Sequence, residues 1–304
     1  MEMRKALHNA LANVMRKNDK VCVIDADLAK ANGTWDLRNE FPERALDVGI
    51  AENMASVAAG LSTYGYIPFI SSFAAFATRN VADQIYISVC YAKQNVKIIG
   101  SDPGIFVAKA GGTHMSFDDI SIFRSFPDMV IFEPADAIEL TQAIEQITDH
   151  YGPLYLRMPR GERPAVHDEQ YRFDLFKADT LRSGSDVSIL ASGFMVEPSL
   201  RAAEQLKADG IDAEVINVHT IKPLDRETIL ASVKKTGKVI TCENHNVFGG
   251  LYSAVSELLC NALPCKVETV AVYDQFGQVG LTHELAVHYK LTSDEVVRKV
   301  KAMF

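Results

Sequence analysis

Runs of apolar residues alternate with amphipathic segments along almost the whole chain. In the first half, the short runs are apolar throughout rather than at every second position, which is typical of parallel strands that helices cover on both faces. These runs span residues 20–27, 66–72, 95–101, 128–134 and 153–159. The helical patterns around them span residues 1–19, 52–64, 74–93 and 136–149. The first half therefore predicts a parallel sheet with helices on both faces.

A second series of alternating elements begins near residue 186. Its predicted strands span residues 186–193, 212–220, 238–244 and 265–274, and its predicted helices span residues 197–209, 225–236 and 248–262. A last helix is expected at the C-terminus, where Thr292 and Glu295 have the spacing of a capping box. Residues 163–183 are polar and irregular, which indicates a linker. We predict an α/β protein with a domain at 1–162 and a smaller one at 184–304.

Charge and composition exclude several classes of protein. The 304 residues carry 31 Lys and Arg against 39 Asp and Glu, a net charge of −8, which argues against nucleic acid as a partner. The first 19 residues lack the apolar core of a signal peptide, and no apolar run approaches the ~18 residues of a membrane span. The five cysteines form no CxxC pair, so we expect free thiols and a cytoplasmic protein.

The motifs that usually hold phosphates or metals are missing from the sequence. There is no G-x-G-x-x-G after a strand, no G-x-x-x-x-G-K-[ST], and no G-x-S-x-G elbow. The histidines do not fall at the spacing of zinc ligands, so we expect no metal site in this chain. Any cofactor with phosphate groups must therefore be held by something else, such as another chain.

One carboxylate, Glu52, stands at the head of a run of small apolar residues in DVGIAENMASVAAGLSTYGY, residues 47–66. An acid at a helix N-terminus stabilises the helix by ~0.3–1 kcal/mol, and this alone could explain it. The alternative is a desolvated carboxyl that stays protonated and donates a hydrogen bond to a ring nitrogen. The small residues would also let another helix approach closely.

Five other side chains are candidates for a site. Phe73 and Phe76 share a helix face and form either a core pair or a flat wall for a planar ring. His114 ends the glycine-rich loop GGTH at residues 111–114, where a histidine suits substrate binding or proton transfer. Arg4 and Arg160 are surface charges unless the fold brings them together, in which case they could hold an anion.

The order of these features resembles a known family. The pattern DVGIAEN, AAGLSTYGYIPFISSFAAF, GGTH and FRSFPDM resembles the pyrimidine-binding domain of thiamine diphosphate enzymes in the transketolase and deoxyxylulose-phosphate synthase group. CENHNVFGGLYSAVSELL is similar to the opening of their C-terminal domain. The chain looks most like the C-terminal subunit of a split transketolase. That resemblance implies an N-terminal partner subunit whose GDG…N motif holds Mg²⁺ and the diphosphate, in a complex with two of each chain.

The resemblance also implies roles for the candidate residues. Glu52 matches the glutamate that bonds the aminopyrimidine ring nitrogen of thiamine diphosphate. Phe76 matches the phenylalanine that stacks on that ring in transketolases, and Phe73 matches its equivalent in the synthases. His114 matches a substrate-binding histidine, so we expect Glu52 and His114 to be the catalytic residues.

Arg4 and Arg160 match two arginines that hold the substrate phosphate in the family, but the sequence departs from the family at nearby positions. The family has an aspartate at Ala110 and a serine at Ala31, and a family histidine is missing where Ser101 and Asp102 stand. A family proline is replaced by Gly112. These departures remove contacts to ordinary sugar phosphates, so the anion could instead be a sulfonate.

The function implied is transfer of a two-carbon ketol unit from an anionic ketose to an aldose, in a complex with the partner subunit. Two alternatives stay open at this point. One is the β-subunit of a 2-oxo acid dehydrogenase decarboxylase, which shares the two-domain layout. The other is a non-catalytic subunit that keeps the fold.

Overall fold

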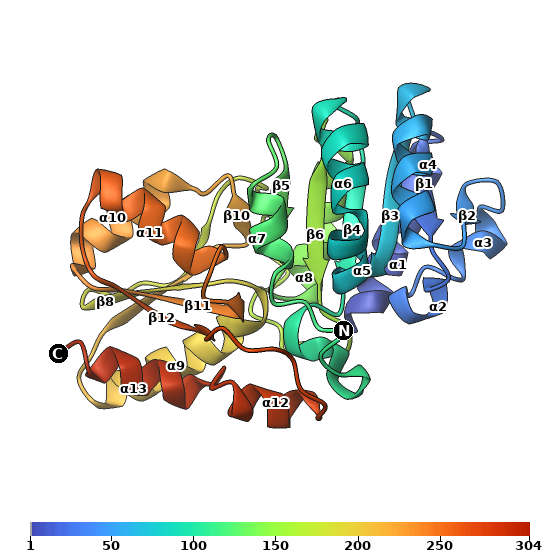
Figure 1. Ribbon diagram of the computed structural model, residues 1–304. Helices are drawn as coiled ribbons and strands as arrows, with labels where there is room; N and C mark the ends of the chain where they lie inside the picture. Colours follow the sequence, from blue (N-terminus) through green and yellow to red (C-terminus); the bar gives the residue numbers. More distant parts are fainter. Residues whose placement is uncertain (1) are drawn as a thin grey trace.

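The computed structural model describes residues 2–304 and contains two sheets, each covered by helices on both faces (Figure 1). The strands of the first sheet are β1 (Val21–Asp25), β2 (Ala45–Asp47), β3 (Ile67–Phe73), β4 (Lys97–Ser101), β5 (Val130–Phe132), β6 (Leu154–Met158) and β10 (Thr220–Lys222). Their order across the sheet is β10-β5-β6-β4-β3-β1-β2. All of them run parallel except β10. The predicted parallel sheet is confirmed.

Two layers of helices cover the first sheet. On one face, α1 (Met3–Lys17) packs against α8 (Ala137–Asp149), and their apolar residues form one core with β1 and β6. On the other face lies α4 (Ala51–Thr63), together with the helical segment that follows β3. Short helices α2 (Ala29–Asn32), α3 (Leu37–Glu40) and α7 (Asp119–Arg124) lie in the connections.

The single helix predicted over 74–93 is wrong. The segment is broken into α5 (Ala74–Thr78), a 3₁₀ turn η1 (Arg79–Val81), α6 (Ala82–Gln84) and a π-helical stretch η2 (Ile85–Tyr91). At the break, the Thr78 hydroxyl donates to the Ala74 carbonyl at 2.6 Å, a bond within the helix that often bends it. The break matters because it turns the chain at Arg79, next to the loop that carries His114.

The second sheet has five strands, which are β7 (Asp179–Arg182), β8 (Val187–Ala191), β9 (Ala213–Asn217), β11 (Val239–Asn246) and β12 (Val267–Val272). Their order across the sheet is β12-β11-β8-β9-β7. The helices of this half are α9 (Val196–Ala208), α10 (Arg226–Thr236), α11 (Leu251–Ala262), α12 (Thr282–His288) and α13 (Ser293–Lys301), with the 3₁₀ turn η4 (Gly193–Met195). The 3₁₀ turn η3 (Gly104–Ala110) belongs to the first half of the chain but packs against α12. As Figure 1 shows, α9 and α13 cover one face and α10 and α11 the other. Thr292 caps α13 by accepting a hydrogen bond from Glu295 N at 3.3 Å.

Two strands tie the halves of the chain together and were not predicted. β7 comes from the predicted linker and forms the antiparallel edge of the second sheet. β10 follows the second domain's β9 but pairs with β5 of the first sheet. A short polar strand at a sheet edge lacks the apolar run by which a strand is predicted from sequence. The domain boundaries at 162 and 183 therefore stay predictions.

A buried arginine joins the two halves more firmly. The Arg157 guanidinium on β6 is fully buried and donates to Asp119 at 2.7 Å and to Glu133 at 2.6 Å. It also donates to the Asn244 carbonyl on β11 at 2.9 Å. Burial opposes ionisation of Asp119, but the positive Arg157 outweighs it and holds the pKa of this carboxyl below its usual value. The hydrogen bonds of one side chain thus connect both sheets.

A second buried cluster anchors the linker. His167 lies between Asp136, at 3.1 Å, and Asp179, at 3.2 Å. Burial alone would lower the pKa of this imidazole, but the two carboxylates and the nearby Glu139 raise it to about 10. Tyr171 stacks on the ring at 3.9 Å between centroids and donates to Glu139 at 3.1 Å. The linker is therefore held by a charged histidine.

This cluster predicts a pH dependence of stability. Because the pKa of His167 rises from 6.5 to about 10 on folding, its contribution to the free energy of unfolding is complete below pH 6.5. That contribution is lost as the pH rises through about 10. His167→Gln should lower the free energy of unfolding at pH 6.5 by on the order of 2 kcal/mol. Urea unfolding of both proteins between pH 6 and 10 should show this difference shrinking. A difference that stays constant with pH would contradict the charged state.

None of the helices in residues 2–304 has both the length and the hydropathy needed to span a lipid bilayer. All five cysteines are unpaired: Cys22, Cys90 and Cys242 are buried, and Cys260 and Cys265 are exposed.

Candidate active site

The predicted site residues follow the carboxyl ends of neighbouring parallel strands. Glu52 follows β2, Phe73 and Phe76 end or follow β3, and Arg160 follows β6. Parallel strands all end at one edge of their sheet, where ligands bind in open α/β folds. Arg4 reaches the same edge because the chain just before it pairs with residues 161–162.

Phe73, Phe76 and His114 form one aromatic cluster. The His114 ring lies 5.3 Å from Phe76 and 6.5 Å from Phe73, both edge to face, and the two phenylalanines are 6.0 Å apart. All three side chains are only partly buried, so they face an opening rather than a closed core. The Nδ1 atom of His114 lies 3.0 Å from the Thr113 hydroxyl. The cluster provides an apolar wall with one imidazole beside it.

Glu52 lies in the first turn of α4 and is half-buried. Its Oε2 atom is shielded from solvent and has no hydrogen-bond partner among the described residues. A covered, unpaired carboxyl oxygen is costly unless something outside the chain completes it. The atom therefore fits a hydrogen bond to a bound polar group such as a ring nitrogen.

The prediction that the small residues of α4 form a contact surface is wrong for most of them. Ala55, Ala58 and Ala59 are buried in this chain's own core, because the helix turns their face toward β3. The exposed face of α4 includes Ser56, Val57 and Gly60. Any close approach by another helix therefore involves that second set of residues instead.

Arg160 is held by a buried acid that sequence reasoning did not assign. Its Nε atom donates to Asp102 at 2.8 Å, and its guanidinium lies 5.7 Å from the Phe73 ring. Burial raises the pKa of Asp102 to about 6, although Arg160 and Arg4 both pull it down. Asp102 thus places Arg160 beside the aromatic cluster, and Arg4 acts on the same carboxyl.

Two of the family departures lie beside these arginines. Arg4 donates to the Ala31 carbonyl at 3.3 Å, and its Nε atom donates to Glu2 at 2.7 Å. Ala110 lines a hollow of about 620 Å³ together with Lys109 and Arg160. The small side chain of Ala110 leaves this hollow beside Lys109 and Arg160 open.

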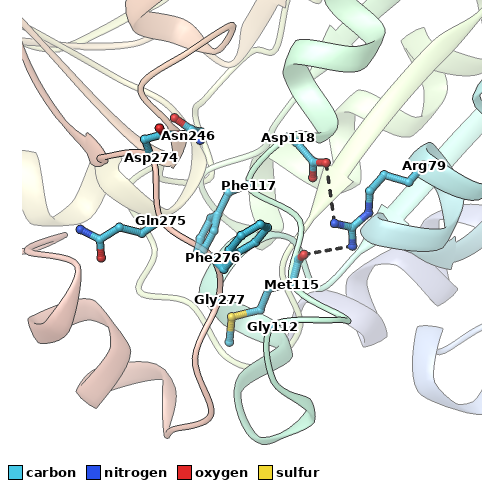
Figure 2. Close-up of a pocket in the computed structure, with 10 residues that line it drawn as sticks. All are labelled: Arg79, Gly112, Met115, Phe117, Asp118, Asn246, Asp274, Gln275, Phe276 and Gly277. Carbon is cyan, nitrogen blue, oxygen red and sulfur yellow. Dashed lines mark hydrogen bonds and ion pairs between the residues drawn. The ribbon is translucent and has the colours of Figure 1, made fainter.

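The His114 loop lies between the two domains. Arg79 donates to the carbonyls of Thr113 and Met115, both at 3.2 Å, and so brackets His114 from the first domain. Figure 2 shows Gly112 and Met115 on the other side next to Gly277 of the C-terminal half, at a hollow of about 140 Å³. Within residues 2–304, no group of His, Cys, Asp and Glu side chains has the arrangement of a metal site.

Two family patterns match this chain. "Transketolase, pyrimidine binding domain" matches residues 1–165, and "Transketolase, C-terminal domain" matches residues 176–296. The first pattern alone covers more than half of the 304 residues. The chain belongs to the transketolase family. The predicted fold, a pyrimidine-binding domain followed by a transketolase C-terminal domain, is confirmed.

Relatives of this transketolase chain include separate subunits of similar length. It is 48% identical to the 6-deoxy-6-sulfo-D-fructose transketolase subunit SqwH of Clostridium sp. (strain MSTE9), over 97% of this chain and 92% of that one. It is 32% identical to one of the subunits of apulose-4-phosphate transketolase from Phocaeicola vulgatus, over 97% and 95% of the two chains. A solved structure described as a split gene transketolase, inactive beta4 tetramer, is 40% identical with a TM-score of 0.93 and covers 99% and 98%. The resemblance to a split transketolase subunit is confirmed.

Several residues that hold the candidate site together were missed from the sequence. Arg157 left a signal, since it is a single charge inside the apolar run at 153–159, as Glu52 is in its own run. Asp119 begins α7, and its buried carboxyl pairs with Arg157. Asp102 and Arg79 left no signal, because their roles depend on loops that the fold brings together.

The buried Asp102 predicts that this site costs stability. Its pKa rises from 3.8 to about 6 on folding. Its favourable contribution to the free energy of unfolding is therefore complete below pH 3.8 and is lost as the pH rises through about 6. Asp102→Asn should therefore raise the free energy of unfolding at pH 7 by on the order of 1–2 kcal/mol. Urea unfolding measures this, and the gain should fall toward zero near pH 4. Asp149→Asn, which alters an exposed carboxylate, is the control; a destabilised Asp102→Asn protein at pH 7 would contradict the account.

Proposed function

We propose that this chain is the C-terminal subunit of a two-chain transketolase that moves a two-carbon ketol unit from an anionic ketose to an aldose. The observation that carries this proposal is the convergence at one sheet edge of an unpaired carboxyl, an apolar wall, a histidine and two arginines. Members of the family use thiamine diphosphate. Each of these groups at the sheet edge matches one requirement of catalysis with thiamine diphosphate.

The cofactor end of the site consists of Glu52, Phe73 and Phe76. The covered Oε2 atom of Glu52 suits a hydrogen bond to the pyrimidine ring nitrogen, and it is unpaired within residues 2–304. Phe76, with Phe73 behind it, offers a face on which the ring can stack. Thiamine diphosphate, when bound, supplies the nucleophilic carbon and the electron sink, whereas these residues set its protonation and orientation.

The substrate end consists of His114, Arg160 and Arg4. The imidazole of His114 stands at the apolar wall, where it can exchange hydrogen bonds with a sugar hydroxyl or carbonyl oxygen. Arg160 and Arg4 can bind the charged end of the sugar through charge-assisted hydrogen bonds. Asp102 keeps Arg160 in place until an anion arrives.

The partner subunit holds the rest of the cofactor in this proposal. The sequence has no glycine-rich diphosphate loop, and residues 2–304 contain no metal-binding group of side chains. We infer an N-terminal transketolase subunit that carries GDG…N, Mg²⁺ and the diphosphate. The free thiols favour a cytoplasmic location for the complex.

The surface formed by α4 and η2 is the expected place for assembly. It displays large exposed apolar side chains, which are costly in water and typical of interfaces. They are Ile50, Val57, Tyr64, Tyr86, Ile87 and Tyr91. The partner subunit and a second copy of this chain can both pack here, which would give two of each chain.

For the substrate, we favour a sulfonated ketose over a phosphorylated one. The relative named for 6-deoxy-6-sulfo-D-fructose is 48% identical, whereas the one named for apulose-4-phosphate is 32% identical. Ala31 and Ala110 remove two polar groups beside the arginines. A sulfonate carries one negative charge and needs fewer partners than a phosphate dianion.

The role of Glu52 predicts a loss of turnover without a loss of fold. In the complex with the partner subunit, Glu52→Gln should lower kcat by on the order of 10²–10⁴-fold, because the amide cannot supply the proton. Two-carbon transfer is measured with thiamine diphosphate and Mg²⁺ present. Glu169→Gln on the exposed linker is the matched control and should keep wild-type activity. Near-normal turnover in Glu52→Gln, or full activity of this chain alone, would refute the proposal.

The anion-binding role predicts a selective effect on KM. A screen of ketose donors should give the highest kcat/KM with a 6-sulfonated sugar. Arg160→Gln should raise the KM of that donor by about tenfold or more, since one charged hydrogen bond is lost, and should change an uncharged ketose little. Equal use of charged and uncharged ketoses by the wild-type complex would contradict the assignment, and a preference for phosphorylated donors would contradict the sulfonate. Pyruvate decarboxylation without sugar transfer would favour the 2-oxo acid dehydrogenase alternative.

A further inference from the structure

The C-terminal domain touches the His114 loop at a contact too close for side chains. The contact is made by residues 274–281, which connect β12 to α12 and are called the docking segment below. A Cβ atom on Gly112 would lie 2.4 Å from the Gly277 carbonyl oxygen, and one on Gly277 would lie 2.9 Å from the Gly112 Cα atom. Figure 2 shows both glycines at this crossing. Gly112 stands two residues before His114 in the chain. Two backbones therefore pass each other with no room for even a methyl group.

This contact explains why position 112 carries a glycine. Any side chain at 112 would clash with the Gly277 carbonyl, which is backbone and cannot rotate away. Neither glycine has a positive φ angle, so close approach, not backbone conformation, explains both of them.

The docking segment is tied to the body of the C-terminal domain. The Tyr289 hydroxyl at the end of α12 donates to the Phe276 carbonyl at 2.8 Å. The same ring packs edge to face on Phe117 at 5.3 Å, and the Phe117 carbonyl accepts a hydrogen bond from Asn246 N at 2.9 Å. The rest of the C-terminal domain thus holds the docking segment in place, packed against the His114 loop.

The C-terminal domain also holds the other end of the same stretch of chain. Asn244 on β11 accepts from Ile105 N and donates to the Pro103 carbonyl, both at 3.3 Å. Gly104 packs so closely on Asn244 that a Cβ there would lie 2.3 Å from its Oδ1 atom. The C-terminal domain therefore grips residues 103–115 at both ends.

We propose that the docking segment positions His114 for the sugar, with Gly112 and Gly277 as positioning residues that act through this loop. The first domain contributes Arg79, which brackets His114 from the opposite side. Together they hold the imidazole against Phe76. The inference rests on the proposed function only in assigning His114 to the sugar; the geometry of the loop is independent of it.

The test compares Gly277→Ala and Gly112→Ala in the complex with the partner subunit. Each should raise the KM of the ketose by about tenfold or more, because small misplacements of a positioning group are costly. The half-saturating concentration of thiamine diphosphate should stay within about twofold, since Glu52 and Phe76 are untouched. The double variant should raise the KM of the ketose by less than the product of the two single-variant increases, because the first methyl group already separates the two segments. Val287→Ala, which trims an exposed side chain on α12, is the control.

A second readout does not depend on activity. The histidine ring NMR signals of the full chain are recorded, and His114 is assigned from the signal lost in His114→Asn. The His114 signal should shift in both glycine variants and stay in place in Val287→Ala. If the glycine variants do not fold, Tyr289→Phe removes only the bond to Phe276 and should shift the same signal.

Two outcomes separate this inference from the proposed function. An unmoved His114 signal in the folded variants overturns the inference. If instead the wild-type complex transfers no ketol unit but the signal shifts, the proposed function fails and the positioning of the loop by the docking segment stands.

Discussion

The buried guanidinium of Arg157 is the interaction on which the arrangement of this molecule depends. A charge in the interior is costly unless every donor finds a partner, and here two carboxylates and one carbonyl supply the partners. Those partners come from the head of α7, the end of β5 and β11 of the second domain. One side chain therefore links the two sheets through its hydrogen bonds. Removing either carboxylate would leave buried guanidinium N–H groups without a partner.

The site depends on that junction because its loops run through it. The stretch from Asp102 to Asp119 starts with the acid that holds Arg160 and ends with the acid that holds Arg157. Between them lie His114 and the glycines that meet the docking segment. The unpaired oxygen of Glu52 and the raised pKa of Asp102 both cost stability at neutral pH. The rigid junction offsets such costs and keeps the edge of the sheet open for ligands.

Local pattern was enough to predict the parts of this structure that depend on neighbouring residues. Fully apolar runs located the central strands. Glu52 was singled out as a lone carboxylate at the head of an apolar run, and the roles of Phe73 and Arg160 came from the resemblance to the family. The break at Thr78 was missed because the helical pattern of the sequence continues through it, and the strand at 179–182 was missed because it pairs with a distant strand. Small residues in α4 suggested a contact surface, but composition alone did not show that the alanines face inward. Asp102 and Gly277 could not be found, since their partners are 58 and 165 residues away in the chain.

The central claim is that this chain provides one half of a cofactor site and that another subunit provides the other half. Isothermal titration of thiamine diphosphate with Mg²⁺ into this chain, into the partner subunit and into their mixture tests it directly. The account predicts tight binding only in the mixture, near one cofactor per pair of chains, and weaker binding when Glu52→Gln replaces the wild-type chain. Equally tight binding to this chain alone would contradict it.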